Sequence, residues 1–200
     1  MSDGGDRWDA ACLALCLLAV DPVGLKGLTL RARSGPARQA FVDMLPILPL
    51  PRRKLHPNIS DEQLFGGIDL AATLADQKLV LSQGLTSAPA ALILTMAERA
   101  EAGLAAKLAR VLDEDRGHCL ILLDEGAEDS EHAPPALSER LAFHVALDGV
   151  SATEITPCST DPATLDAARA RLPAIPTGED EVKLLVGIAA RFGIHSLRAP

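Results

Sequence analysis

The chain has 200 residues, a formal net charge of −8 and a pI near 5.1, with 48% hydrophobic and only 2% aromatic residues. This length fits one domain of about 150 residues plus a small appendage, with a core built from aliphatic side chains. The basic residues are scattered and aromatic rings are scarce, whereas a nucleic-acid surface usually shows a clustered basic stripe and stacking aromatics. We therefore expect no nucleic-acid partner.

An apolar run from Ala10 to Val20 is the first predicted element. Three aspartates make the preceding segment acidic and no small-residue cleavage site is clear, so the run does not match a signal peptide. It is also shorter than the roughly 20 apolar residues that a membrane span requires. We therefore expect a buried helix over residues 9–20, ending before Pro22, and no membrane span.

The cysteines and histidines do not form a metal-binding pattern. Cys12, Cys16, Cys119 and Cys158 show neither CxxC nor zinc spacing, and the five histidines are dispersed, so no metal site is expected. Cys12 and Cys16 share one face of the predicted helix, where small buried side chains are the usual explanation. Reduced cysteines fit a cytoplasmic protein, and His144, inside an apolar strand pattern, is expected to be a core histidine.

The stretch from Gly27 to Phe41 has the context of a phosphate-binding loop without its chemistry. A P-loop follows a buried strand, opens a helix and reads G-x-x-x-x-G-K-[ST]. Its backbone N–H groups and lysine surround the phosphates, and its hydroxyl binds Mg²⁺. A strand over residues 25–30 and a helix over residues 37–45 supply the context. The defining residues are replaced by Arg31, Pro36, Ala37 and Arg38.

We therefore expect no nucleotide to bind in cis at the degenerate loop Ser34, Gly35, Pro36, Ala37 and Arg38. Pro36 removes a backbone donor and fixes φ, and Ala37 cannot reach a phosphate. The arginines at positions 31, 33 and 38 either attract an anion, or are solvated or pair with acidic neighbours. The second interpretation is the one that we favour.

The rest of the chain alternates predicted strands and helices. Residues 46–57 are rich in proline and basic side chains, which predicts an extended connection across the surface. Continuous apolar runs are typical of parallel strands covered on both faces, and they occur over residues 90–96, 119–123 and 143–147. Helices are predicted over residues 70–76, 98–112 and 136–141, with a hairpin arm over residues 78–84. This alternation indicates an α/β fold with a doubly wound parallel sheet.

The pattern becomes helical toward the C-terminus. A helix over residues 161–172 begins with a favourable cap and proline pair, and an amphipathic helix over residues 180–192 is closed by Gly193. We therefore divide the chain into an α/β domain over residues 1–150 and the start of a small helical lid over residues 151–200. We expect this lid to be truncated.

Several segments resemble, in order and spacing, the AAA+ module of magnesium chelatase. The sequence LFGGIDL at Leu64–Leu70 resembles the V-G-x-I-D segment that precedes an insertion hairpin in that family. The step Gly84-Leu85 is similar to the family's GLL entry into the Walker B strand. The resemblance covers nearly the whole chain, and it implies an AAA+-type P-loop NTPase fold in which helices sandwich a parallel sheet.

The same resemblance assigns roles to two arginines. The sequence ALSERLAF at Ala136–Phe143 is similar to the family's QLLDRFG segment, which places Arg140 at the arginine-finger position. Residues 192–199 resemble the lid segment with a sensor arginine, here Arg198. Arg140 would then act in trans on ATP held by a neighbouring subunit. The alternative is a surface arginine that pairs with Glu139 or Asp124.

The departures from the family pattern point to its D subunit rather than its ATP-hydrolysing I subunit. On this alignment the Walker B carboxylates fall on Thr95 and Met96, and the sensor-1 asparagine falls near Ala127, so the groups that hydrolyse ATP in cis are replaced. A rival assignment takes the LILLDE sequence as the Walker B strand. The chain would then be an unconventional NTPase that uses Asp124 and Glu125.

The resemblance implies a non-catalytic scaffold of magnesium chelatase. Such a subunit would assemble with I subunits into an AAA+ ring and couple to the porphyrin-binding H subunit, for ATP-dependent Mg²⁺ insertion into protoporphyrin IX in (bacterio)chlorophyll biosynthesis. ATP and Mg²⁺ would enter through the partner ATPase, so we expect no cofactor in this domain. The acidic loop over residues 124–135 either binds a divalent ion loosely or stays in solvent. An unrelated α/β binding module, with its pocket at the carboxyl ends of the strands, is the remaining alternative.

Overall fold

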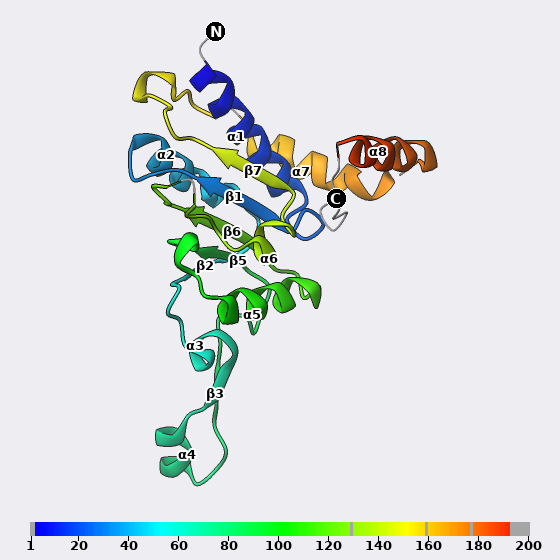
Figure 1. The fold of residues 1–200 in the computed structure, drawn as a ribbon. Helices are drawn as coiled ribbons and strands as arrows, with labels where there is room; N and C mark the ends of the chain where they lie inside the picture. The colour runs from blue at the N-terminus through cyan, green and yellow to red at the C-terminus, as the bar shows by residue number, and fades with distance from the viewer. Residues whose placement is uncertain (1–2, 129, 159, 177, 193–200) are drawn as a thin grey trace.

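The structure is a computed structural model that describes residues 3–128, 130–158, 160–176 and 178–192 (Figure 1). Its α-helices are α1 (Asp3–Val20), α2 (Pro36–Met44), α3 (Asp61–Phe65), α4 (Leu70–Asp76), α5 (Ala102–Asp113), α6 (Pro135–Ser138), α7 (Pro162–Arg171) and α8 (Glu179–Arg191). Its strands are β1 (Gly27–Arg31), β2 (Arg52–Leu55), β3 (Gly66–Ile68), β4 (Leu81–Gln83), β5 (Ala91–Leu94), β6 (Cys119–Asp124) and β7 (Phe143–Ala146). Short 3-10 helices cover Leu45–Ile47, Ala97–Arg99, Ala152–Glu154 and Leu172–Ala174.

Five parallel strands form one sheet in the order β2-β5-β6-β1-β7. Because all five run the same way, their carboxyl ends share one edge, where Arg31 of β1 lies opposite Asp124 of β6. Helices cover both faces, as parallel sheets require. The predicted α/β class is therefore confirmed.

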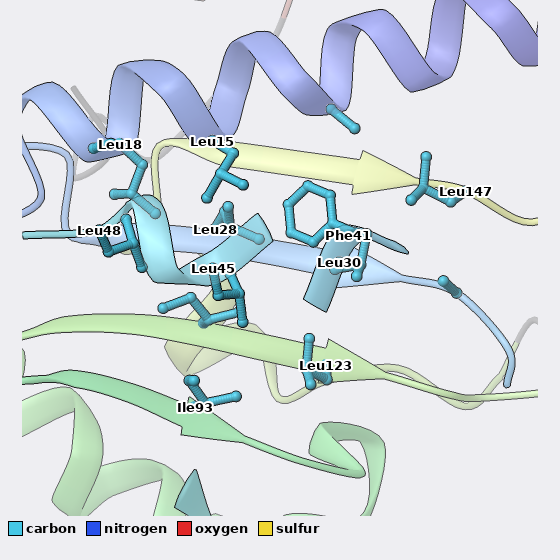
Figure 2. Packing of buried hydrophobic residues seen from close by; sticks show 14 of the residues in the cluster. Leu15, Leu18, Leu28, Leu30, Phe41, Leu45, Leu48, Ile93, Leu123 and Leu147 are labelled. Atoms are coloured by element: carbon cyan, nitrogen blue, oxygen red, sulfur yellow. The ribbon is translucent and has the colours of Figure 1, made fainter. Parts of the chain in front are cut away.

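One face of the sheet packs against α1 and α2. Alternate residues of a strand point to opposite faces, so Ile121 and Leu123 of β6 join this side. Leu15 of α1 and Phe41 of α2 are fully buried against Leu28 of β1 (Figure 2). Aliphatic side chains thus supply almost the whole core, as the composition predicts.

The opposite face packs against α5 and α6. Leu120 and Leu122, the intervening residues of β6, join Leu92 of β5 and Leu108 of α5 in a second buried cluster. This explains why β6 reads as an uninterrupted apolar run, since both of its faces are covered. The strand is also central, between β1 and β5.

Two expectations about the sheet edges are wrong. The region from Pro46 to Pro57 is not only a surface connection, because Arg52–Leu55 contains no proline and forms the edge strand β2, paired with β5. Strand β7 is not buried on both faces. Among the strands that the structure describes it pairs with β1 alone, and its residues alternate between half-buried and exposed. His144 is therefore exposed rather than a core histidine.

The first helix is longer than predicted and also binds α7. It starts at Asp3, and acidic residues in its first turn suit the positive end of the helix dipole. Leu165 of α7 joins the core cluster of α1, and the Arg169 guanidinium donates from Nε to the Ala19 carbonyl at 2.7 Å. The C-terminal helices α7 and α8 are present as expected, while the domain division at residue 150 stays a prediction.

A hairpin arm projects away from the sheet (Figure 1). Strands β3 and β4 pair antiparallel around α4, as the predicted arm requires. Ser60 caps α3 at its base, accepting a hydrogen bond from the Gln63 backbone N–H. Across the part of the chain that the structure describes, no helix is long and apolar enough to cross a membrane.

Candidate functional site

The loop between β1 and α2 keeps the position of a phosphate-binding loop but loses its donors. Pro36 is the first residue of α2 and directly follows Gly35, so this helical position has no N–H group. Ala37 is buried beside Phe41, in place of a lysine that would need its charged end near the phosphates. With Ser34, Arg38 and residues 147–150, the loop lines a hollow of about 420 Å³. The hollow has room for a small ligand, but its lining lacks the lysine and one of the backbone N–H groups that bind phosphate in a P-loop.

A carboxylate takes one of the loop's remaining amide donors. Asp148 Oδ1 accepts a hydrogen bond from the Arg33 backbone N–H at 3.0 Å. The Arg33 guanidinium turns away and donates to the Ala127 carbonyl at 3.1 Å. A fixed negative charge at this place repels a phosphate instead of cradling it.

Arg31 is committed to holding the acidic loop against the end of β1. Its Nη1 donates to the Glu131 carbonyl at 2.7 Å and lies 3.4 Å from Asp124 Oδ2 and 2.7 Å from His132 Nδ1. Its Nη2 donates to the Glu128 carbonyl at 2.9 Å. The guanidinium therefore closes the acidic loop and is not directed at a phosphate position.

Asp124 is a structural residue of that same loop. Its side chain is 3% exposed, and its two oxygens accept hydrogen bonds from the backbone N–H groups of Gly126 and Ala133, each at 2.9 Å. A carboxylate that is buried and hydrogen-bonded in this way has few lone pairs left for a metal ion. Asp124 therefore holds the loop together through hydrogen bonds to its backbone. This role fits the structure better than the role of Mg²⁺ ligand that the rival NTPase interpretation requires.

Glu125 and Arg38 form an ion pair across the loop, with the two side chains 28% and 19% exposed. The Glu125 backbone N–H donates to Glu98 Oε2 at 2.9 Å. The expectation that the loop arginines pair with acidic neighbours is confirmed for Arg31 and Arg38. Within the described ranges, no three His, Cys, Asp or Glu side chains are arranged to hold a metal ion.

The positions assigned to catalytic groups on β5 carry structural roles. Thr95 donates its hydroxyl to the Leu55 carbonyl at 3.1 Å, which ties the end of β5 to β2. Met96 adopts a left-handed backbone conformation with φ of 47° as the chain leaves the sheet. Neither residue offers a carboxylate, so the residues at these two positions do not fit Mg²⁺-ATP.

Arg140 lies at the opposite edge of the sheet. It follows α6, and its Nε and Nη2 donate to the two carboxylate oxygens of Asp113, each at 2.9 Å. With Lys26, which precedes β1, and Leu112, these two residues line a hollow of about 360 Å³ at the amino ends of the strands. The Arg140 side chain is 14% exposed.

The partner of Arg140 is not the one that sequence reasoning offered. It pairs with Asp113 instead of Glu139 or Asp124, and the hydrogen bond to Asp113 raises the pKa of Arg140 above its ordinary value. Arg140 therefore stays charged and held in one orientation. Arg198, the expected sensor arginine, lies outside the described residues.

Comparison with known proteins identifies the chain's relatives. No protein-family model matches it. It is 50% identical over 193 residues to the magnesium-chelatase 60 kDa subunit of Cereibacter sphaeroides, an alignment that covers 96% of this chain and 34% of the relative. It is 44% identical over 189 residues to the corresponding subunit of Rhodobacter capsulatus, covering 94% and 34%. Over nearly its whole length the chain is similar to magnesium-chelatase D subunits. It spans about a third of the length of these relatives.

The comparison with solved structures finds a similar fold in a magnesium-chelatase complex. A model of the complex between the magnesium-chelatase subunits BchI and BchD, based on a cryo-EM reconstruction, superposes with a TM-score of 0.52 at 17% identity. It covers 92% of this chain and 86% of that chain. The likeness shows the fold alone, which is α/β of the AAA+ type.

Two residues of the site were missed by sequence reasoning. Asp113 lies in the last turn of α5, 27 positions before Arg140, and Asp148 lies just beyond β7, 115 positions after Arg33. Both are acidic residues in otherwise unremarked segments. Only the parallel pairing of the strands, which brings distant strand ends to one edge, places them beside their partners.

Proposed function

We propose that this chain is a non-catalytic AAA+-type scaffold of a magnesium chelatase, which assembles with an ATP-hydrolysing subunit and leaves ATP and Mg²⁺ to it. One observation carries the proposal: the groups around the old phosphate loop are bound to one another. Asp148 accepts a hydrogen bond from a backbone N–H of the phosphate-loop segment, and Arg31 holds the acidic loop. Both carboxylate oxygens of Asp124 accept hydrogen bonds from backbone N–H groups. A site closed in this way supports contact with a competent neighbour rather than hydrolysis in cis.

The I subunit is the proposed ring partner. The superposed complex contains BchI together with BchD, and relatives at 50% and 44% identity carry the magnesium-chelatase name. We extend the proposal to coupling with the porphyrin-binding H subunit and to Mg²⁺ insertion into protoporphyrin IX for (bacterio)chlorophyll. In that scheme the metal ion is a substrate of the whole complex. The cytoplasmic location stays a prediction.

Arg140 is the residue that we assign to the neighbour's nucleotide. It lies at the amino ends of the strands, whereas the degenerate loop lies at their carboxyl ends, so Arg140 cannot serve its own loop. An arginine on the far edge is placed to meet a nucleotide held by an adjacent subunit and to stabilise the charge that develops on its γ-phosphate. Asp113 would hold the guanidinium until that phosphate, with its greater negative charge, replaces it.

The test combines this chain with a magnesium-chelatase I subunit. Arg140→Ala should leave co-purification intact and lower the ATPase rate of the assembly by about tenfold or more, because an arginine finger contributes through transition-state charge. Arg110→Ala is the matched control: Arg110 lines a second surface hollow that Arg140 also lines, is 79% exposed, and pairs with Glu114 one helical turn away. Equal rates for the Arg140 variant and the parent assembly would refute the trans role. Failure to co-purify at all would refute the scaffold role.

The runner-up is an NTPase that uses Asp124 and Glu125. Titration of this chain with a fluorescent ATP analogue and Mg²⁺ separates the two proposals. The scaffold proposal expects no saturation in the micromolar range and no turnover. Micromolar binding with turnover that is lost in Asp124→Asn would favour the NTPase instead.

A further inference from the structure

Three of the four cysteines come together where α1 meets the segment before α7. Cys16 of α1 and Cys158 have their sulfur atoms 3.7 Å apart. Cys12, one turn earlier on α1, is close enough to Cys158 for that thiol to contribute to the raised pKa of Cys12. Thr160 Oγ1 lies 3.1 Å from Cys16 Sγ. These contacts join positions that are more than 140 residues apart in the sequence, and the spacing of the cysteines gave no indication of them.

The surroundings hold this cluster in place. On one side, the Trp8 indole N–H donates to the Thr156 carbonyl at 2.8 Å. On the other side, Arg169 of α7 donates to the Ala19 carbonyl at 2.7 Å. The two sulfur atoms are thus kept close by contacts that do not involve them. The helices α1 and α7 lie side by side there (Figure 1).

We propose that Cys16 and Cys158 are an oxidation site, at which a disulfide fastens the segment leading into α7 onto α1. Both cysteines are free and partly exposed, so a small oxidant can reach them. Their sulfur atoms lie 3.7 Å apart, and a disulfide would bring them to about 2.05 Å. Three thiols can also ligate a soft metal ion, but the described residues include no group of three arranged to do so.

The oxidant that balances the reaction is a low-molecular-weight disulfide such as oxidised glutathione. One thiolate of the pair attacks a sulfur atom of the disulfide, which forms a mixed disulfide and releases one small thiolate. The second cysteine thiolate then attacks the protein sulfur of the mixed disulfide and releases the other small thiolate. Two protein thiols are oxidised, one small disulfide is reduced, and the two protons pass to the released thiolates.

The cluster is a resting dithiol that responds to oxidation. Burial raises the pKa of Cys16, and burial together with the neighbouring Cys158 raises the pKa of Cys12 to about 12. The protonated thiol is a poor nucleophile, so exchange with a small disulfide is slow at neutral pH and becomes faster as pH rises. Reversible disulfides in reducing compartments usually serve redox sensing rather than permanent stabilisation.

The test treats the reduced chain with oxidised glutathione, followed by thiol counting and peptide mapping without reduction. We expect loss of two thiols per chain, a cross-linked peptide that joins Cys16 to Cys158, and full reversal by dithiothreitol. Closing so long a loop should raise Tm by about 5–15 °C. Cys119→Ala is the matched control, because Cys119 is fully buried in β6 and should not change the cross-link. Cys12→Ser should also retain it, and Cys158→Ser should abolish it.

Several outcomes would overturn the proposal. Glutathione adducts without an internal cross-link would show that the pair cannot close. A cross-link that vanishes in Cys12→Ser would assign the bond to Cys12 rather than Cys16. A cross-linked chain with a lowered Tm would show that the bond distorts the contact between α1 and α7 instead of fastening it.

Discussion

Replacing Arg31 with alanine tests whether the old phosphate loop has become a structural clamp. The side chain is 21% exposed and contacts Asp124, two backbone carbonyls and His132. Removing one partner of a buried ion pair costs about 3–5 kcal/mol. The share here is nearer about 1 kcal/mol, because the Nη1 distance is 3.4 Å and Asp124 keeps two backbone donors. Two lost hydrogen bonds add about 1 kcal/mol each, for a total of about 3 kcal/mol.

Urea unfolding followed by circular dichroism measures this loss, which corresponds to a Tm lower by about 6–12 °C for a chain of this size. Arg116→Ala is the control, since Arg116 is 67% exposed beside Glu114 and should change stability by less than about 1 kcal/mol. An Arg31 variant as stable as the control would refute the clamp. If ATP also raised the Tm of the parent chain and not of the Arg31 variant, the arginine would be a phosphate ligand.

Three further predictions concern the core, a buried histidine and the hairpin arm. Phe41→Ala should lower the free energy of unfolding by about 3–5 kcal/mol, because Phe41 is fully buried. Leu79 is 66% exposed, so Leu79→Ala should change that free energy by less than about 0.5 kcal/mol. Equal urea midpoints for the two variants would contradict the assigned core. Burial lowers the pKa of His118, so the unfolded chain takes up the proton first as pH falls below about 6.5 and stability declines there. His118→Gln should remove that decline, and identical urea midpoints from pH 7.5 to 5.5 in both proteins would show that His118 carries no such coupling. Gly66→Ala should loosen the arm, because Gly66 has φ of +88° and an added Cβ would lie 2.3 Å from the Ser82 carbonyl; limited proteolysis should then cut the arm faster, and an unchanged cleavage rate would contradict this.

The fold follows from sequence where the pattern reports burial directly. Residues 119–123 are apolar throughout because β6 is covered on both faces, and residues 102–112 show helical spacing because α5 covers only one of them. The pattern is weaker at the edges. The basic strand β2 has exposed side chains, and His144 of β7 faces outward, so composition alone assigns the first to a loop and the second to the core.

The sequence alone shows which phosphate-binding groups the candidate site lacks, but it does not show which contacts replace them. Pro36 and Ala37 can be read as missing phosphate contacts from the sequence alone, since no rotamer or pairing restores a backbone N–H or a charged amine. The pairing of Arg33 with Asp148 and of Arg140 with Asp113 depends on which strand ends share an edge. Sheet order decides that, and sheet order is a property of the whole chain.

The carboxyl and amino edges of the sheet differ in how firmly their charged residues are bonded to the rest of the chain. At the carboxyl edge Arg31, Arg33 and Arg38 are bonded to other parts of the chain, so restoring a single residue, such as Ala37→Lys, would leave Asp148 and Asp124 where they are. At the amino edge Arg140 pairs with Asp113 and lines a surface hollow of about 360 Å³. A guanidinium bound to one acid can exchange it for a phosphate, whereas a closed loop cannot reopen without losing its packing. The edge that can still change partners is therefore the edge at which a neighbouring subunit would act.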